Sequence, residues 1–190
     1  KETEENELAA FIASANDEIF NDPMSPVGGN PEGDVSLVEF FDYNCPYCRR
    51  VATVLEELTQ SDPNIRIVYK EFPILGPNST FAARAALAAR TQGRYLEFHN
   101  AVMMGRGIAD EEAVMEFARI AGLDTDRLKV DMEDPAIGAI LQRNLSLAEA
   151  LEISGTPAFV IADEIYPGAA DLAEFRRVIA AARASADPAR

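Results

Sequence analysis

A pair of cysteines at the junction of a strand-like segment and a helical segment is the feature that most constrains this chain. Cys45 and Cys48 are its only cysteines, and two residues separate them. The pattern places Cys45 at the start of a helix and Cys48 one turn inside it. Because free backbone N–H groups and the positive end of the helix dipole meet at a helix start, this position favours a thiolate. The sequence therefore predicts a pair that cycles between dithiol and disulfide.

The overall composition fits one soluble domain, or one domain with an insertion. The chain has 190 residues, of which 48% are apolar and 26% charged, so it is long enough to bury a substantial core. A net charge of −15 argues against nucleic acid or an anionic membrane surface as partner. No apolar run approaches the roughly 18 residues of a membrane-spanning helix. A disulfide between positions so close in sequence stabilises a fold little, so chemistry explains the cysteines better than folding does.

Apolar periodicity predicts the order strand, helix, strand, a block of helices, then a hairpin and a last helix. We expect strands over 35–41 and 65–72, with a helix from the cysteines to Ser61 between them. Further helices are expected over 79–91, 94–104, 111–121, 125–132 and 136–151, followed by short strands over 158–161 and 164–166 and a helix capped by Asp171. This order indicates an α/β fold: a thioredoxin-like core, whose central mixed sheet is flanked by helices, with an inserted helical domain and an N-terminal helical extension.

The predicted organisation has three parts. Residues 1–32 form an N-terminal amphipathic helix and a connector rich in Pro and Gly, residues 33–75 and 152–184 form the core, and residues 76–151 form the inserted helical domain. The first part has an apolar face that must be covered. Either its own domain covers this face, or another copy does so in a homo-oligomer built through residues 1–20. The apolar residues of this face are Leu8, Phe11, Ile12, Ala15, Ile19 and Phe20.

Three motifs in this order resemble the DsbA family of disulfide oxidoreductases, most closely the branch that includes the ScsC proteins. They are the segment 40–43 leading into Cys45-Pro46-Tyr47-Cys48, the segment 71–76, and the segment 154–159. With the helical block, the resemblance covers residues 35–182. Glutaredoxins share the residues around the cysteines, but they have no room for the long segment that follows here.

The resemblance implies a thiol–disulfide oxidoreductase that acts on the thiols or disulfides of substrate proteins and is recycled by a membrane redox partner. It implies a cis bond between Thr156 and Pro157 facing the cysteine pair, where an extended substrate can lie. It also implies that Glu39 lies beneath the disulfide and helps to move the proton of Cys48. No cofactor and no metal are expected. A periplasmic location follows from the resemblance, while the acidic first residues of the chain do not form a signal peptide.

Strand alternation places Glu39 on the face shared by Val35, Leu37 and Phe41, so it should be at least partly buried. Either Lys70 or Glu71 could lie beside it, and their spacing does not choose between them.

Among the residues near the cysteines, Tyr47 stands where many strong oxidants carry a cationic His. It can donate a hydrogen bond but adds no charge, so the thiolate of Cys45 must depend mainly on the helix start. Arg49 and Arg50 are expected to be solvated. The single histidine, His99, is expected to be structural or on the surface.

The direction of exchange, as an oxidase or as an isomerase or reductase, stays open at this stage. A different class of function is a copper-binding or holdase protein that uses the two cysteines as a metal site, since a thiol pair can hold Cu(I). A kappa-class glutathione transferase would use the same fold but does not need this cysteine pair, and it ranks lowest.

Overall fold

A mixed five-stranded sheet organises residues 2–186, the part of the chain that the computed structural model describes. The strand order is β1-β3-β2-β4-β5. β2 and β3 run parallel, and the other neighbouring pairs are antiparallel. The strands are β1 (Val27–Gly29), β2 (Val35–Phe41), β3 (Ile65–Glu71), β4 (Ala158–Ile161) and β5 (Glu164–Pro167).

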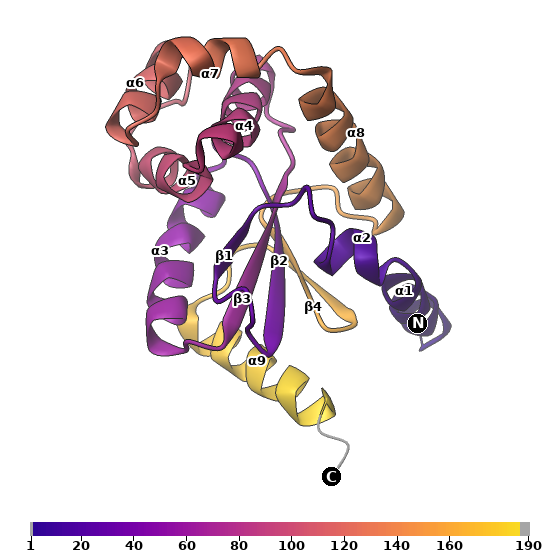
Figure 1. Cartoon of the computed structure of the whole chain (residues 1–190). Helices are drawn as coiled ribbons and strands as arrows, with labels where there is room; N and C mark the ends of the chain where they lie inside the picture. Colours follow the sequence, from indigo (N-terminus) through magenta and orange to yellow (C-terminus); the bar gives the residue numbers. More distant parts are fainter. Residues whose placement is uncertain (1, 187–190) are drawn as a thin grey trace.

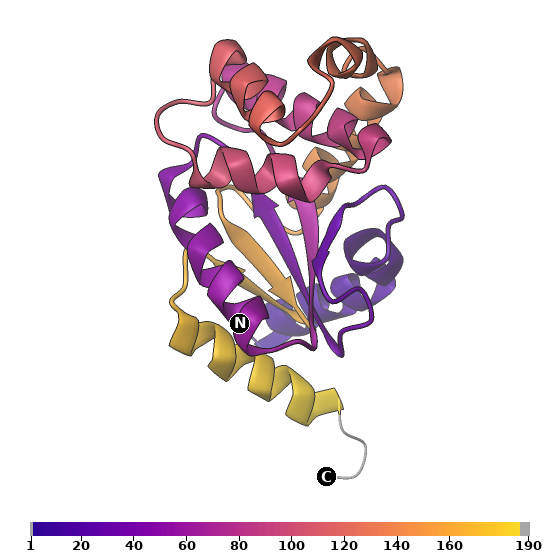
Figure 2. The same ribbon diagram turned by 60° about the vertical axis from the view of Figure 1, so that its left-hand side comes forward.

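Helices cover both faces of this sheet and gather above one of its ends (Figure 1). α3 and α9 lie on one face, and α1, α2 and the end of α8 lie on the other, while α4 to α7 form the upper group (Figure 2). The helices are α1 (Glu2–Ser14), α2 (Asn16–Phe20), α3 (Pro46–Ser61), α4 (Pro77–Ala89), the 3₁₀ turn η1 (Arg90–Gln92), α5 (Tyr95–Met104), α6 (Glu111–Ile120), α7 (Thr125–Asp131), α8 (Pro135–Ala150) and α9 (Leu172–Ala186).

The core consists of two apolar clusters, one on each face of the sheet. Side chains alternate along a strand, so β2 contributes Leu37 and Phe41 to one cluster and Val38 and Phe40 to the other. The first cluster also contains both cysteines and joins the sheet to α3, α9 and the upper helices. Chemistry at the cysteines therefore takes place on one defined face of β2 and β3.

The predicted fold class is confirmed, and most predicted elements differ from the observed ones by at most two residues at either end. The helix predicted over 79–91 is an exception in form: it is α4 from Pro77 to Ala89, followed by the 3₁₀ turn. The three predicted parts of the chain stay a prediction, and residue 1 of the first part lies outside the described residues. The C-terminal half of α8 packs on the sheet through Leu147 and Ala148, so this helix contacts both the upper helices and the sheet.

One part of the expected connector is a strand, which corrects the sequence prediction. β1 pairs antiparallel with β3, with Gly29 opposite Arg66. Gly29 has a φ of 66°, and a Cβ there would lie 2.5 Å from the carbonyl oxygen of Ile65. Glycine is therefore required for β1 to approach β3 this closely. The Gly-rich composition that indicated a loop instead permits an edge strand.

The apolar face of the N-terminal segment packs on its own sheet, the first of the two alternatives. Ile12, Ile19 and Phe20 are buried in the second cluster, against β2, β3 and β4. Lys70 holds this segment against the sheet. Its Nζ donates to the carbonyl oxygen of Glu18 at 2.6 Å and to the hydroxyl of Ser25 at 2.8 Å. The described part of the N-terminal extension is thus integrated into the domain.

Candidate active site

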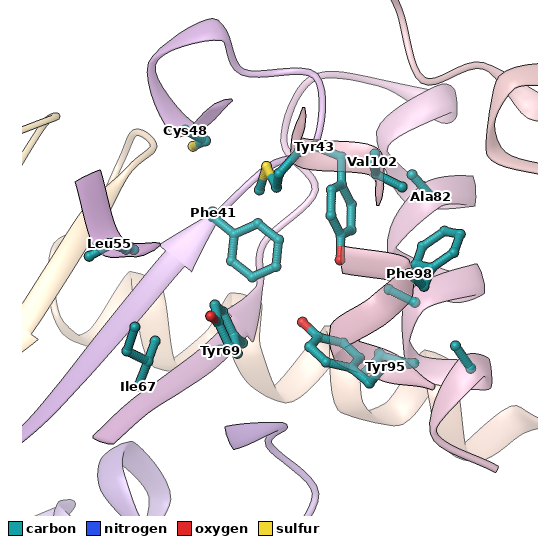
Figure 3. Packing of buried hydrophobic residues seen from close by; sticks show 14 of the residues in the cluster. Phe41, Tyr43, Cys48, Leu55, Ile67, Tyr69, Ala82, Tyr95, Phe98 and Val102 are labelled. Carbon is teal, nitrogen blue, oxygen red and sulfur yellow. The ribbon is translucent and has the colours of Figure 1, made fainter. Parts of the chain in front are cut away.

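The two cysteines lie at the first turn of α3, as the spacing predicted. Cys45 is the N-cap residue, with an extended backbone, and Pro46 occupies the first helical position, where the lack of an N–H is harmless. Both thiols are free, and both residues are buried: Cys45 is 5% exposed and Cys48 0%. Cys48 points into the core near Phe41 and Leu55 (Figure 3). Of the two sulfurs, that of Cys45 is the one with an outer face.

That outer face borders the segment before β4. The sulfur of Cys45 lies 3.3 Å from the main-chain carbonyl oxygen of Thr156. The bond between Thr156 and Pro157 is cis. Ser154 and Gly155 are exposed, and no atom lies within 4 Å of where a Cβ on Gly155 would stand. The backbone at Gly155 is therefore open to solvent.

The loop before Cys45 is held by hydrogen bonds to distant segments. The carboxylate of Asp42 accepts from the N–H of Asn44 at 2.8 Å, from the hydroxyl of Ser79 at 2.7 Å, and from the N–H groups of Ile74 and Leu75 at 2.9 and 3.0 Å. The side-chain oxygen of Asn44 accepts from the N–H of Ala109, in the loop before α6, at 2.8 Å. The position of Cys45 is thus set from the side of the upper helices.

Arg49 is half-buried rather than solvated, which corrects the sequence expectation. Its Nε donates to the carbonyl oxygen of Tyr43 at 2.8 Å, and its Nη1 donates to that of Gly105 at 2.9 Å. Burial lowers the pKa of this guanidinium. Arg50 is exposed, as expected, and lies 5.0 Å from the ring centre of Tyr47 in a cation–π arrangement. Tyr47 itself is 55% exposed.

Glu39 is buried on the cysteine face of β2, as alternation predicted. It is 2% exposed, it stands opposite Tyr69 of β3, and its Oε1 has no hydrogen-bond partner among the described residues. Burial raises the pKa of this carboxyl to about 8. Burial also raises the pKa of the Cys48 thiol, and the negative charge of Glu39 raises it further. Both groups therefore favour their protonated forms.

The structure chooses Glu71 over Lys70 as the residue beside Glu39. Alternation places Lys70 on the opposite face, with the N-terminal segment. Oε1 of Glu71 accepts hydrogen bonds from the hydroxyls of Tyr43 at 3.1 Å and Tyr95 at 2.8 Å. Burial raises the pKa of Glu71, and these two hydrogen bonds oppose the increase.

Sequence reasoning did not find the aromatic side chains that surround this carboxyl. Tyr43 and Tyr95 come from the loop before Cys45 and from α5, and their hydroxyls approach one another in Figure 3. Nδ1 of His99 lies 3.0 Å from the hydroxyl oxygen of Tyr43. Burial lowers the pKa of His99 to about 3, so the ring is neutral. Its place is structural, in agreement with the prediction. Tyr43 and Tyr95 are far apart in sequence, and aromatic residues fill most cores, so these tyrosines were only a weak signal.

A hollow of about 520 Å³ adjoins the first turn of α3. Two of its apolar lining residues are exposed, Leu75 at 51% and Ile108 at 67%. The lining residues are Asn44, Pro46, Arg49, Leu75, Asn78, Gly107 and Ile108. Within residues 2–186, no group of three or more His, Cys, Asp or Glu side chains is placed to hold a metal ion.

The model of the DSBA-like thioredoxin domain family matches residues 36–180. Among solved structures, a thioredoxin-like oxidoreductase from Silicibacter pomeroyi DSS-3 is 51% identical, with a TM-score of 0.86 over 88% of this chain and 96% of that one. The catalytic domain of Proteus mirabilis ScsC is 32% identical, with a TM-score of 0.84 over 93% and 98% of the two chains. The thiol-disulfide exchange protein alpha-DsbA2 from Wolbachia pipientis is 28% identical, with a TM-score of 0.86 over 94% and 97%.

A curated protein that is named as an antiporter also matches part of its length to this chain. The Na(+)/H(+) antiporter NhaA 1 of Salinispora arenicola is 30% identical over 145 residues, which are 73% of this chain but only 22% of that protein. The chain thus spans about a fifth of this relative. In the described part of the chain, the helices are too short or too polar to cross a membrane.

Proposed function

The chain belongs to the family of DsbA-like thioredoxin domains, and from this premise we propose that it exchanges disulfides with the thiols of substrate proteins through Cys45 and Cys48. The observation that carries the proposal is the asymmetry of the two sulfurs. Cys45 stands at the N-cap of α3 beside an open segment, whereas Cys48 is sealed in the core. The first can meet a substrate, and the second can only meet the first.

The cycle begins with the oxidised protein. A substrate thiolate attacks the sulfur of Cys45, a mixed disulfide forms, and the Cys45–Cys48 bond breaks. Cys48 leaves with the electron pair of that bond and takes up one proton. A second substrate thiolate then attacks the substrate sulfur of the mixed disulfide, and Cys45 leaves as a thiolate. The substrate is oxidised by two electrons, and the cysteine pair is reduced by two. Cys45 stands at the N-terminal end of α3, where the positive end of the helix dipole lies.

Glu39 is the proposed source of the proton for Cys48. Glu39 is buried on the face of β2 that packs against the cysteines. In its ionised form, its negative charge raises the pKa of Cys48. Because its pKa is raised to about 8, it holds a proton in neutral solution and can release it to a newly formed thiolate. Running the cycle backwards returns the proton to Glu39.

The proposed substrate is an extended protein segment lying along residues 154–156. Thr156 and Pro157 would position it, with Pro46 and Tyr47 on the other side of the reactive sulfur. The exposed apolar side chains of Tyr47, Leu75 and Ile108 suit unfolded chains, which expose apolar residues that a folded protein buries.

We also propose a periplasmic location and a redox partner in the membrane, because disulfide donors work in oxidising compartments. A periplasmic thioredoxin-like protein from Salmonella enterica serovar Typhimurium is 30% identical, with a TM-score of 0.77. A homo-oligomer built through residues 1–20 would need a surface other than Ile12, Ile19 and Phe20, since these are buried within the chain.

A redox titration of the cysteine pair against glutathione tests the proposal. A single two-electron transition that disappears in Cys45→Ser, together with loss of insulin reduction, is the expected result. A potential of about −120 mV would assign the oxidising direction, and one of about −270 mV the reducing direction. Stoichiometric Cu(I) binding without any disulfide exchange would overturn the proposal in favour of a metal-binding protein.

A further inference from the structure

Two buried carboxyl groups, rather than one, lie on the cysteine face of the sheet. In the parallel pairing of β2 with β3, Glu39 stands opposite Tyr69, and Phe41 stands opposite Glu71. The two acids are therefore on adjacent strands, one step apart along the same face. Glu39 is 2% exposed and Glu71 1%. The mechanism above uses only the first of them.

The two carboxyls have different surroundings. Oε1 of Glu71 accepts from two tyrosine hydroxyls, whereas Oε1 of Glu39 and Oε2 of Glu71 have no hydrogen-bond partner in the part of the chain that the structure describes. The charges that reach Glu71 are negative, those of Asp42 and Glu39. The titratable groups that face this pair from the packed elements are Asp42 and Tyr43 of the loop after β2, Tyr69 of β3, Cys48 of α3, and Tyr95 and His99 of α5.

We propose that Glu71 is a positioning residue that acts through Glu39: the two carboxyls repel each other, so together they carry at most one negative charge in neutral solution. Like charges on adjacent strands of a buried sheet cannot both form without a large penalty, since burial removes both carboxyls from the screening effect of bulk water. Burial raises the pKa of both carboxyls, so Glu39 can lose its proton only while Glu71 keeps its own.

This inference rests on the proposed function and deepens it. When the disulfide opens, the leaving sulfur of Cys48 takes a proton from Glu39, and one negative charge appears on the acid pair. When the disulfide forms again, that proton returns. The hydroxyl of Tyr43 links Glu71 to the loop that holds Cys45, and it also contacts His99. Glu71 thereby adjusts the pH range over which Glu39 can supply its proton, without touching either sulfur.

Carbon-13 NMR of labelled glutamate carboxyls, followed against pH in the oxidised protein, tests the coupling directly. The wild-type pair should titrate in two steps, as interacting acids do. In Glu39→Gln and in Glu71→Gln, the remaining acid should titrate in one step that lies at least about one pH unit below the upper wild-type step. If that upper step stays in place when either partner is removed, the two acids are independent and the inference is wrong.

A matched variant separates coupling from loss of structure. Asn144 donates to the main-chain oxygen of Glu71 at 2.9 Å, so Asn144→Ala weakens the same region without changing a charge. It should lower the melting temperature and leave both steps unmoved. If Glu71→Gln fails to fold, Tyr95→Phe removes one donor from Glu71 and should raise the upper step. An unmoved step in Tyr95→Phe would count against the inference.

The pH dependence of the rate of disulfide reduction shows whether the coupling of the two acids affects function. Glu71→Gln should move the midpoint of this profile, whereas a purely structural change lowers the rate equally at every pH. The NMR measurement needs no turnover, so it distinguishes two failures. Coupled steps in a protein that exchanges no disulfides would overturn the proposed function, and uncoupled steps in an active protein would overturn only the role of Glu71.

Discussion

The sulfur of Cys45 and the carbonyl oxygen of Thr156 are 3.3 Å apart, and the thiol donates to this carbonyl. The same carbonyl is one that an extended substrate would use to accept a main-chain N–H. A disulfide has no S–H to donate. The oxidised protein therefore leaves this acceptor free for a substrate, and the reduced, protonated protein occupies it.

A comparison of Cys45→Ala with Cys45→Ser tests this competition. Serine keeps a donor at this position and alanine does not. A peptide with serine in place of its cysteine should bind Cys45→Ala about fivefold more tightly, the equivalent of one hydrogen bond of about 1 kcal/mol. Calorimetric titration measures both affinities. Equal affinities would show that the carbonyl takes no part in binding.

The stability of the oxidised protein should depend on Glu39 with a defined sign. Its pKa is about 8 in the folded state against 4.5 for the free group, so between these values the folded protein holds a proton that the unfolded chain has released. The contribution of Glu39 to the free energy of unfolding is therefore largest below about pH 4.5 and is lost as the pH rises towards 8. Glu39→Gln should remove up to about 5 kcal/mol of this dependence. Urea unfolding at several pH values measures it, and parallel curves would contradict it.

His99 should give the opposite dependence at acid pH. Its pKa falls from 6.5 to about 3 on burial, so between these values the unfolded chain binds a proton that the folded protein does not. Stability due to this residue is lost as the pH falls from 6.5 through 3, by up to about 5 kcal/mol. His99→Phe should be less stable at pH 7 but less sensitive to acid. A wild-type protein and variant that lose stability in parallel below pH 6 would refute this.

Asp42→Ala should loosen the loop that carries Cys45. It leaves the N–H groups of Ile74 and Leu75 without their carboxylate acceptor, which costs about 2–4 kcal/mol in unfolding free energy. Turnover per folded molecule should also fall. Asp110→Ala is the matched control, because this exposed carboxylate only caps α6 by accepting from Ala113 and is worth about 1 kcal/mol. Equal losses of turnover in both variants would argue against a specific role for Asp42.

The parts of the fold that the sequence predicted well are those whose own residues determine them. The strands over 35–41 and 158–161 have these bounds in the structure, because runs of β-branched and aromatic residues buried on both faces are distinctive. The start of α3 at Pro46 follows equally from local chemistry. β1 was missed because its partner β3 determines it, and a three-residue edge strand leaves no pattern of its own.

Within the candidate site, the limits of sequence reasoning were also physical. Alternation shows that Lys70 and Glu71 lie on opposite faces, but only the register of β2 with β3 shows which of them faces the cysteines. Arg49 was expected in solvent because its hydrogen-bond acceptors, on Tyr43 and Gly105, are brought to it by tertiary structure. The tyrosines around Glu71 come from separate segments for the same reason.

The anchoring of residues 42–44 to segments beyond β3 limits how proteins of this architecture can be recombined. Asp42 is held by Ser79 of α4, and Asn44 by the backbone before α6. A chimera that exchanged the upper helices for those of a distant homologue would replace the supports of its own reactive loop. Grafts of this kind should retain reactivity only where the loop and its supporting helices are transplanted together.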